Sequence, residues 1–301
     1  MIRIETTPYG GWNNNVRISN REVEAILTGD VGPRVIRFAF KGEKNVFCEL
    51  PGQIGGSGEK EFMLRGGHRL WIAPEEKPRS YECDNAPIRI SVSKTRVTAV
   101  QAPGPITGIQ KRIDLELAPD RNMLTVTHRL VNRGRKPFEL APWALSIMAP
   151  RGTAIIPLPA KIPHFKRLTH NQRWSLWGYT DFGDPRWTFL PRCILFRQDP
   201  KRPPNKLGIE HREGWAAYQL GTTLFVKRFA HVPNRAYPDG GVNFETFSDQ
   251  NFLELESLGP LTTLAPGRAA VHREVWSLHR DVPPCRSDAG FDRIQKLALK
   301  C

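Results

Sequence analysis

The sequence predicts an all-β protein of large antiparallel sheets with few short helices. Three observations lead to this prediction. Short segments that alternate apolar and polar residues recur along most of the chain, 26 prolines and 25 glycines supply turns between them, and helical spacing is scarce. Strands at regular spacing with turn signals between them are typical of large antiparallel sandwiches and barrels. The 301 residues are enough for one large domain of this class.

Each expected strand is rich in β-branched or aromatic residues and is bounded by Gly, Pro, Asn or Asp. Turns are expected at Asn20-Arg21 and at Gly32-Pro33. In chain order, the expected strands are residues 16–19, 23–27, 35–40, 88–92, 96–100, 109–117, 123–131, 215–220, 223–229, 251–258 and 271–278.

One helix is expected at residues 288–299, where Phe291, Ile294 and Leu297 recur at helical spacing and Asp288 is the expected N-cap. The least regular part is an insertion at about 157–204, rich in Pro, Trp and Arg. A long irregular insertion on a β scaffold often carries function or covers a cavity mouth, although a packed surface excursion would look the same. Because no linker interrupts the chain, we expect a single domain over residues 1–301.

The net charge of +14 favours anionic partners: nucleic acid, anionic lipid headgroups or acidic sugars. The basic residues are scattered, which disfavours nucleic acid. No apolar run is long enough to cross a bilayer, and the N-terminus lacks the apolar core of a signal peptide. We therefore expect a cytoplasmic protein without a membrane partner. The five cysteines contain no Cys-x-x-Cys pair, and the phosphate-loop and dinucleotide motifs are absent, so neither metal nor cofactor is expected.

The segment at residues 252–261 contains the strongest site candidates. Glu254 and Glu256 lie two positions apart within an otherwise apolar strand, so both face the same side of a sheet. Two carboxylates on a largely desolvated strand are costly unless they are paired or bind something. The alternatives are a site for a ligand or plain ion pairs with nearby arginines.

A second candidate group surrounds His68, which is flanked by Arg65, two glycines and Arg69. Glycines allow a ligand to approach the backbone, and arginine offers a fork of donors to hydroxyls or carboxylates. The alternative is a turn histidine bonded to backbone. Trp143 is a candidate stacking platform for a sugar ring, with a core residue as the alternative.

Polar residues of the later strands complete the candidate set. Lys227 shares a strand face with two phenylalanines, which suggests pairing with Glu245, Glu254 or Glu256. The alternative for this lysine is an edge-strand side chain that reaches solvent. The turn and strand at 237–245 bring Tyr237, Asp239 and Glu245, all suited to hydrogen-bonding sugar hydroxyls. Lys206 is assigned to a polar loop and is a weaker candidate.

Several of these segments together resemble the galactose mutarotase-like superfamily, which contains the aldose 1-epimerases. Gly-Pro-Arg-Val-Ile-Arg-Phe-Ala-Phe-Lys-Gly at 32–42 is similar to its early strand and glycine turn. Arg-Gly-Gly-His-Arg-Leu-Trp at 65–71 and Leu-Glu-Ser-Leu at 255–258 fall where that superfamily has segments near the sugar. Leu-Ala-Pro-Gly-Arg at 264–268 with 271–276 resembles its closing turn and final strand. The resemblance is to an uncharacterised branch and covers about residues 16–280.

This resemblance implies a β-supersandwich around a sugar cleft, with Glu256 as the general base of anomer interconversion. In a mutarotase the base takes the anomeric hydroxyl proton while a histidine protonates the ring oxygen. The segment that usually contains this histidine is absent. Trp143 lies near the corresponding position, and residues 139–145 contain no histidine. His68 or Lys227 would have to act as the acid. Arg65, Arg69, Trp143, Tyr237, Asp239, Glu245 and Glu254 are the expected sugar contacts.

Three functions remain open from the sequence. The first is an aldose 1-epimerase-like isomerase acting on a small or oligomeric sugar, including an anionic one. The second is a sugar-binding protein that kept the cleft and lost the acid. The third is a relative of the polysaccharide lyases or glycoside hydrolases.

Overall fold

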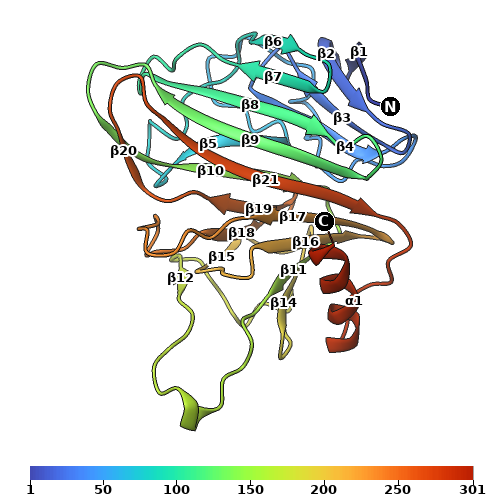
Figure 1. The fold of residues 1–301 in the computed structure, drawn as a ribbon, viewed down its shortest axis with the longest axis vertical. Helices are drawn as coiled ribbons and strands as arrows, with labels where there is room; N and C mark the ends of the chain where they lie inside the picture. Colours follow the sequence, from blue (N-terminus) through green and yellow to red (C-terminus); the bar gives the residue numbers. More distant parts are fainter. Residues whose placement is uncertain (301) are drawn as a thin grey trace.

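Two large antiparallel sheets packed face to face make up the structure, a computed structural model that describes residues 1–300 (Figure 1). The first, sheet I, contains in spatial order β1 (Arg3–Tyr9), β2 (Trp12–Ser19), β3 (Val23–Thr28), β4 (Arg34–Phe40), β5 (Gly67–Ala73), β10 (Phe138–Met148), β19 (Leu253–Leu258), β18 (Phe244–Ser248), β15 (Asn205–Ile209) and β12 (Trp174–Leu176), with β20 (Thr262–Leu264) paired to β10. The predicted all-β class with large antiparallel sheets is confirmed.

The second, sheet II, has ten strands. They are, in spatial order, β13 (Trp187–Phe189), β14 (Cys193–Arg197), β11 (Thr153–Pro157), β16 (Trp215–Leu220), β17 (Thr223–Phe229), β21 (Ala269–His279), β9 (Met123–Asn132), β8 (Ile109–Leu117), β7 (Arg96–Val100) and β6 (Arg89–Val92).

The main hydrophobic core lies between the two sheets and draws on strands of both. In β9 the residues alternate strictly between buried and half-buried, as expected for a strand with one face on a core. By contrast, β5 and β19 are buried at every position, so both faces of the centre of sheet I are covered. The outer face of this centre, away from sheet II, carries the candidate site described below.

The expected helix is present as α1 (Asp288–Leu299). Its N-cap is Ser287 rather than the expected Asp288, because the Ser287 hydroxyl accepts the Gly290 N–H at 3.4 Å. The apolar stripe of α1 packs on the outer face of sheet II, where Phe291 stacks on Trp215 with ring centroids 5.8 Å apart. Figure 1 shows α1 beside β11 and β16.

The insertion at about 157–204 is more regular than the sequence suggested. It contains β12, β13 and β14, which extend both sheets at one end, and a short 3-10 helix, η1 (His164–Lys166). Figure 1 shows the loop that carries η1 reaching well beyond the sheets. Among residues 1–300, no helix has the length and apolar character needed to cross a membrane.

Candidate functional site

Four neighbouring strands in sheet I align polar side chains in a row across its outer face. Arg69 on β5 is paired with Leu145 on β10, Leu145 with Glu256 on β19, and Glu256 with Glu245 on β18. Directly paired residues in antiparallel strands project from the same face. The two glutamates expected near a ligand, Glu245 and Glu256, are therefore immediate neighbours.

Flanking rows add aromatic and charged residues on the same face. Trp71 pairs with Trp143, and Glu254 pairs with Phe247, which in turn pairs with Lys206 on β15. The Trp71 and Trp143 rings meet edge to face with centroids 5.4 Å apart. Period two thus places Glu254 and Glu256 together, as the sequence predicted.

A cavity of about 330 Å³ opens over this surface, and we refer to it as the aromatic pocket. Most of its wall is aromatic, with two carboxylates and two cations at its edges. It is lined by Phe62, Leu64, Arg69, Trp71, Glu75, Tyr81, Trp143, Leu145, Tyr179, Lys206, Phe247, Phe252 and Glu254.

Lys206 ties two of the buried carboxylates together. Its ammonium lies 2.6 Å from Glu245 Oε2 and 3.5 Å from Glu256 Oε2. It also sits over the rings of Trp143 and Trp177, at 4.9 and 4.5 Å from their centroids. Burial opposes the charge of Lys206, but Glu256 and Glu245 outweigh it, so the pKa of the ammonium is raised.

Glu256 is fully buried at the floor of this region. Its Oε2 accepts the indole N–H of Trp143 at 2.9 Å, while its Oε1 has no hydrogen-bond partner among the described residues. Burial raises the pKa of Glu245 well above its usual range, against the opposing effect of Lys206. Lys206 is therefore the shared counter-ion of Glu245 and Glu256, and Oε1 of Glu256 remains without a hydrogen-bond partner.

Arg69 and Glu254 face each other at the edge of the pocket, 3.6 Å apart. The Arg69 guanidinium stacks on Trp71 at 3.9 Å, and burial lowers its pKa to about 10 despite Glu254. Burial, reinforced by Glu256, raises the pKa of Glu254 to about 8. At neutral pH, Glu254 is therefore mostly a protonated acid that can donate a proton.

Several of the buried polar atoms that lack partners lie together at this place. Nε and Nη1 of Arg69 have no acceptor, and Oε1 of Glu254 and Oε1 of Glu256 have no donor, within the described chain. Unpaired buried polar groups cost free energy, so their concentration calls for an explanation. A ligand in the aromatic pocket whose groups both donate and accept hydrogen bonds would pair with Arg69 and Glu254, which line the pocket, whereas Glu256 lies beneath the lining.

His68, expected to act as an acid near Glu256, lies on the opposite face of sheet I, which is a correction to the sequence analysis. It alternates with Arg69 along β5, so Arg69 faces the aromatic pocket and His68 faces sheet II. Its Nδ1 is 2.8 Å from the Ser146 hydroxyl, and its Nε2 is 2.7 Å from Nε2 of His128. Burial lowers the pKa of both imidazoles.

Lys227 is also misplaced by the sequence analysis, because its partner is not Glu245, Glu254 or Glu256. It lies fully buried between the sheets, where its ammonium is 2.9 Å from Glu274 Oε1. It also donates to two backbone carbonyls of sheet I at 2.9 and 3.1 Å. Lys227 thus joins sheet II to sheet I and does not reach the aromatic pocket.

The surrounding polar group, which we call the inter-sheet network, consists of Ser146, His68, His128, Lys227, Ser257, His272, Glu274 and Trp276. Glu274 accepts from Lys227, from the Ser257 hydroxyl and from the Trp276 indole. His128 donates through Nδ1 to a backbone carbonyl at 3.1 Å. His68, His128 and Glu274 are close enough to hold a metal ion, but their ring nitrogens and carboxylate oxygens already have protein partners. This arrangement favours a hydrogen-bonded network over a metal centre.

Three further predicted sugar contacts also lie outside the aromatic pocket. Arg65 is buried and bonded to Glu59, to Asn85 at 3.0 Å and to a backbone carbonyl, so it holds loops together. Tyr237 lines a different cavity, and its hydroxyl accepts the Val232 N–H. The backbone carbonyl of Asp239 accepts the Ser175 hydroxyl, which fixes a turn.

Sequence reasoning missed several pocket residues. Lys206, assigned to a polar loop, lies on β15 at the centre of the carboxylate group. Trp71 follows Arg69 by two positions, so period two along residues 67–73 was a signal that could have found it. Tyr179, which lines the pocket, and Trp177, which contacts Lys206, belong to the insertion, and no local pattern connects them to β5 or β19.

No protein-family model and no curated protein matches this chain. Solved structures do resemble it. A galactose mutarotase-like protein from Lactobacillus casei aligns with TM-score 0.61 and 13% identity, covering 88% of this chain and 100% of that one. A galactose mutarotase-like protein from Clostridium acetobutylicum gives TM-score 0.58 and 10% identity over 93% of this chain and 99% of that one.

A third structure, a galactose mutarotase related enzyme from Lactobacillus acidophilus, gives TM-score 0.57 and 10% identity over 90% of this chain and 99% of that one. The likeness spans nearly the whole length of each protein, while the identities are low. It bears out the fold that the sequence resemblance implied. This chain therefore has the galactose mutarotase-like fold.

Proposed function

We propose that the aromatic pocket binds a sugar and that the chain interconverts the two anomers of that sugar by general acid/base catalysis. The observation that carries this proposal is the set of unpaired buried atoms at the aromatic pocket: donors on Arg69 and an acceptor on Glu254, which line it, and an acceptor on Glu256 beneath them. Sugar hydroxyls both donate and accept, and the apolar face of a pyranose stacks on aromatic rings.

The charge of the pocket favours a neutral sugar over an anionic one. Four carboxylates, Glu75, Glu245, Glu254 and Glu256, lie in or under the pocket against the two cations Arg69 and Lys206. An added anion would find only Arg69 and Lys206 to meet it, and each of these cations already lies beside a glutamate in a poorly solvated space. The net charge of +14, which suggested an acidic substrate, is thus not concentrated at the aromatic pocket.

In the proposed mechanism, Glu256 is the base and Glu254 replaces the missing histidine as the acid. Oε1 of Glu256 takes the proton of the anomeric hydroxyl, while protonated Glu254 gives its proton to the ring oxygen. The ring bond breaks, the carbonyl carbon rotates, and the reverse transfers close the ring on the other face. Two neighbouring carboxyl groups in different environments are suited to this division of roles.

The role of Arg69 and Lys206 in this scheme is to hold the two acids in place. Arg69 stays near Glu254 and has free N–H groups for a sugar hydroxyl. Lys206 pairs with Oε2 of Glu256, which leaves Oε1 as the oxygen that can receive a proton.

A second candidate function is a sugar-binding protein without catalysis. It is favoured by Trp143, whose indole caps Glu256 at the place where the fold family has its catalytic histidine. Under this alternative, the sugar would contact Glu254 and Arg69 and leave Glu256 below the binding surface.

Exchange NMR of the wild-type protein with glucose, galactose and mannose separates the two functions. Anomer exchange faster than in buffer for at least one sugar supports the isomerase. Tryptophan fluorescence changes or thermal stabilisation by a sugar, without added exchange, support the binding protein. Ultraviolet-absorbing unsaturated ends released from a polysaccharide would instead indicate a lyase, and no response to any saccharide would refute the proposal.

A further inference from the structure

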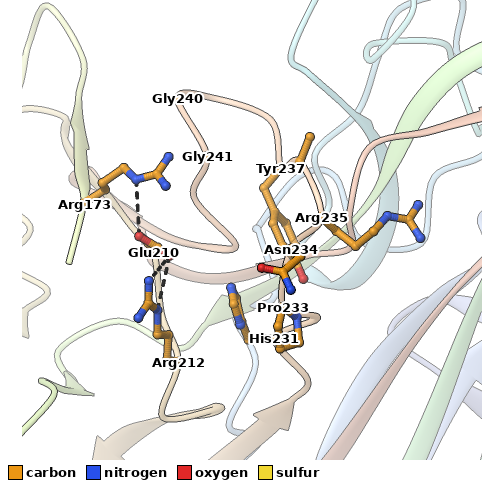
Figure 2. Close-up of a pocket in the computed structure, with 11 residues that line it drawn as sticks. Arg173, Glu210, Arg212, His231, Pro233, Asn234, Arg235, Tyr237, Gly240 and Gly241 are labelled. Carbon is orange, nitrogen blue, oxygen red and sulfur yellow. Dashed lines mark hydrogen bonds and ion pairs between the residues drawn. The ribbon is translucent and has the colours of Figure 1, made fainter. Parts of the chain in front are cut away.

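A second cavity, of about 650 Å³, lies at the far end of β15 from Lys206. Figure 2 shows its two walls. Arg173 and Arg212 form one wall and both approach Glu210, while His231, Asn234 and Tyr237 stand on the other. We refer to it as the arginine cavity.

The arginine cavity is separate from the aromatic pocket. Lys206 and Glu210 lie on the same face of the chain, four residues apart, or about 13 Å along an extended strand. Gly208 lies between them, and a side chain added there would contact Trp177 at 3.1 Å and Val242 at 3.0 Å. These two side chains therefore cover the strand between the cavities, so the second cavity needs its own explanation.

One carboxylate orients both arginines of the wall. Arg212 donates through Nε and Nη2 to Glu210 Oε1, at 3.2 and 2.6 Å, and Arg173 Nε lies 3.4 Å from Oε2. Glu210 is almost buried, whereas the side chains of Arg173 and Arg212 are 58% and 50% exposed. Two guanidinium groups on one carboxylate leave one positive charge in excess.

The terminal nitrogens of Arg173 and Nη1 of Arg212 keep free donor capacity within the described chain. Gly241 leaves room for Arg173, because a side chain at Gly241 would come within 3.1 Å of Arg173 Nη1. Gly241 also has a φ of 95°, which favours glycine. Arginine forks of this kind match the planar geometry of a carboxylate.

The opposite wall offers a flat surface. The rings of His231 and Tyr237 stack with centroids 5.6 Å apart and an interplanar angle of 15°. Tyr237 is locked because its hydroxyl accepts the Val232 N–H at 2.9 Å. A ring with an apolar face can pack against such a pair while its charged group reaches the arginines.

We propose that the arginine cavity binds an acidic sugar, with the sugar carboxylate on Arg173 and Arg212 and the ring against His231 and Tyr237. The wall formed by Arg173, Glu210 and Arg212 carries one excess positive charge, which suits a monoanionic carboxylate better than a dianionic phosphate. The site is independent of the proposed function, since Trp177 and Val242 separate it from the aromatic pocket. Part of the net positive charge of the chain would then serve to bind an acidic ligand.

Isothermal titration calorimetry with D-glucuronate at low ionic strength tests this site. Wild-type protein should bind glucuronate more tightly than D-glucose or inorganic phosphate. Arg212→Gln should weaken binding roughly tenfold to a hundredfold, because it removes charge-assisted hydrogen bonds. Arg212→Lys, which keeps the charge without the fork, should give an intermediate affinity. Arg173→Gln, at an exposed position, provides the same test if the Arg212 variant does not fold.

Arg235→Gln is the matched control. Arg235 also lines the cavity, but its guanidinium points away from Glu210 and donates to Thr262 at 3.3 Å (Figure 2). This variant removes the same formal charge from the cavity and should lower glucuronate affinity much less than Arg212→Gln does. Equal losses in the Arg212 and Arg235 variants, or phosphate or glucose binding as tight as glucuronate, would overturn the proposal.

Discussion

The two faces of sheet I lie against similar groups of buried polar residues, but the two groups differ. On the inner face, the inter-sheet network joins Lys227, Glu274, His68 and His128 with every charged group paired. On the outer face, a comparable set of acids and cations leaves donors and acceptors unpaired. Both groups are buried, so burial and charge alone do not identify a site. The difference lies in hydrogen-bond satisfaction.

This comparison assigns stability to one face and chemistry to the other. A fully satisfied network fixes the position of one sheet on the other, and removing a member should cost folding free energy. An incompletely satisfied group is arranged for a missing partner, and removing a member should cost binding or rate.

The largest effect is expected for Glu256→Gln on the outer face. An amide has nearly the shape of the carboxyl group but cannot accept the anomeric proton. The catalysed anomer exchange should fall by about 10²- to 10⁴-fold, which polarimetry of a freshly dissolved anomer measures. Glu24→Gln, which alters a carboxylate paired with Arg37 on another part of sheet I, is the control and should keep the wild-type rate.

On the inner face, Glu274→Gln should lower the free energy of unfolding by about 3–5 kcal/mol, because it leaves the Lys227 ammonium buried without its counter-ion. Urea denaturation measures this loss. The matched control is Glu116→Gln, which breaks an exposed pair with Arg96 and should cost at most about 1 kcal/mol. Similar losses in the two variants would contradict the structural role of the network.

Stability should also depend on pH through the buried histidines. Burial lowers the pKa of His272 to about 3 in the folded state and lowers those of His68 and His128 as well. The unfolded chain takes up protons near pH 6.5, whereas the folded protein does not. The contribution of these histidines to stability is therefore complete above about pH 6.5 and is lost progressively as the pH falls below it, whereas the raised pKa values of Glu245 and Glu254 act in the opposite direction.

Chemical denaturation between pH 7 and pH 4 measures this loss, and His272→Gln should flatten the slope. If the difference in stability between wild type and His272→Gln stays constant from pH 7 to pH 4, His272 titrates normally in the folded protein.

A smaller, graded effect is expected on the rate at alkaline pH. Glu254, whose pKa burial and Glu256 raise to about 8, is the proposed acid and must be protonated to donate. The rate should therefore fall by about tenfold per unit above pH 8. In Glu254→Gln, the remaining rate should be lower and should lack this decline. A decline that persists in the variant would assign the acid to another group.

The sequence was informative where the alternation of side chains along a strand decides which residues share a face of the sheet. The alternation in 252–258 placed Glu254 and Glu256 on one face, and β18 brought Glu245 beside them. Alternation also puts His68 and Arg69 on opposite faces, but it does not say which face meets the other sheet. Both residues are polar, so hydrophobicity could not decide between them.

Other parts of the site depend on contacts between distant segments. The partner of Lys227 is Glu274 on β21, and strand pairing, rather than local spacing, brings the two together. β15 is buried on both faces, so its sequence lacks the alternation of apolar and polar residues that marks a strand. For this reason Lys206 was assigned to a loop. The sequence indicated Trp143 as a stacking candidate. Its hydrogen bond to Glu256 could not be predicted without the register of β10 with β19.

The most direct test of the two-face account is exchange NMR on His68→Gln beside wild-type protein, with unfolding measured on the same samples. The account predicts a less stable protein whose folded fraction interconverts anomers at the wild-type rate, because His68 faces sheet II. Loss of exchange in a fully folded His68→Gln protein would contradict it and would return catalysis to the inner face.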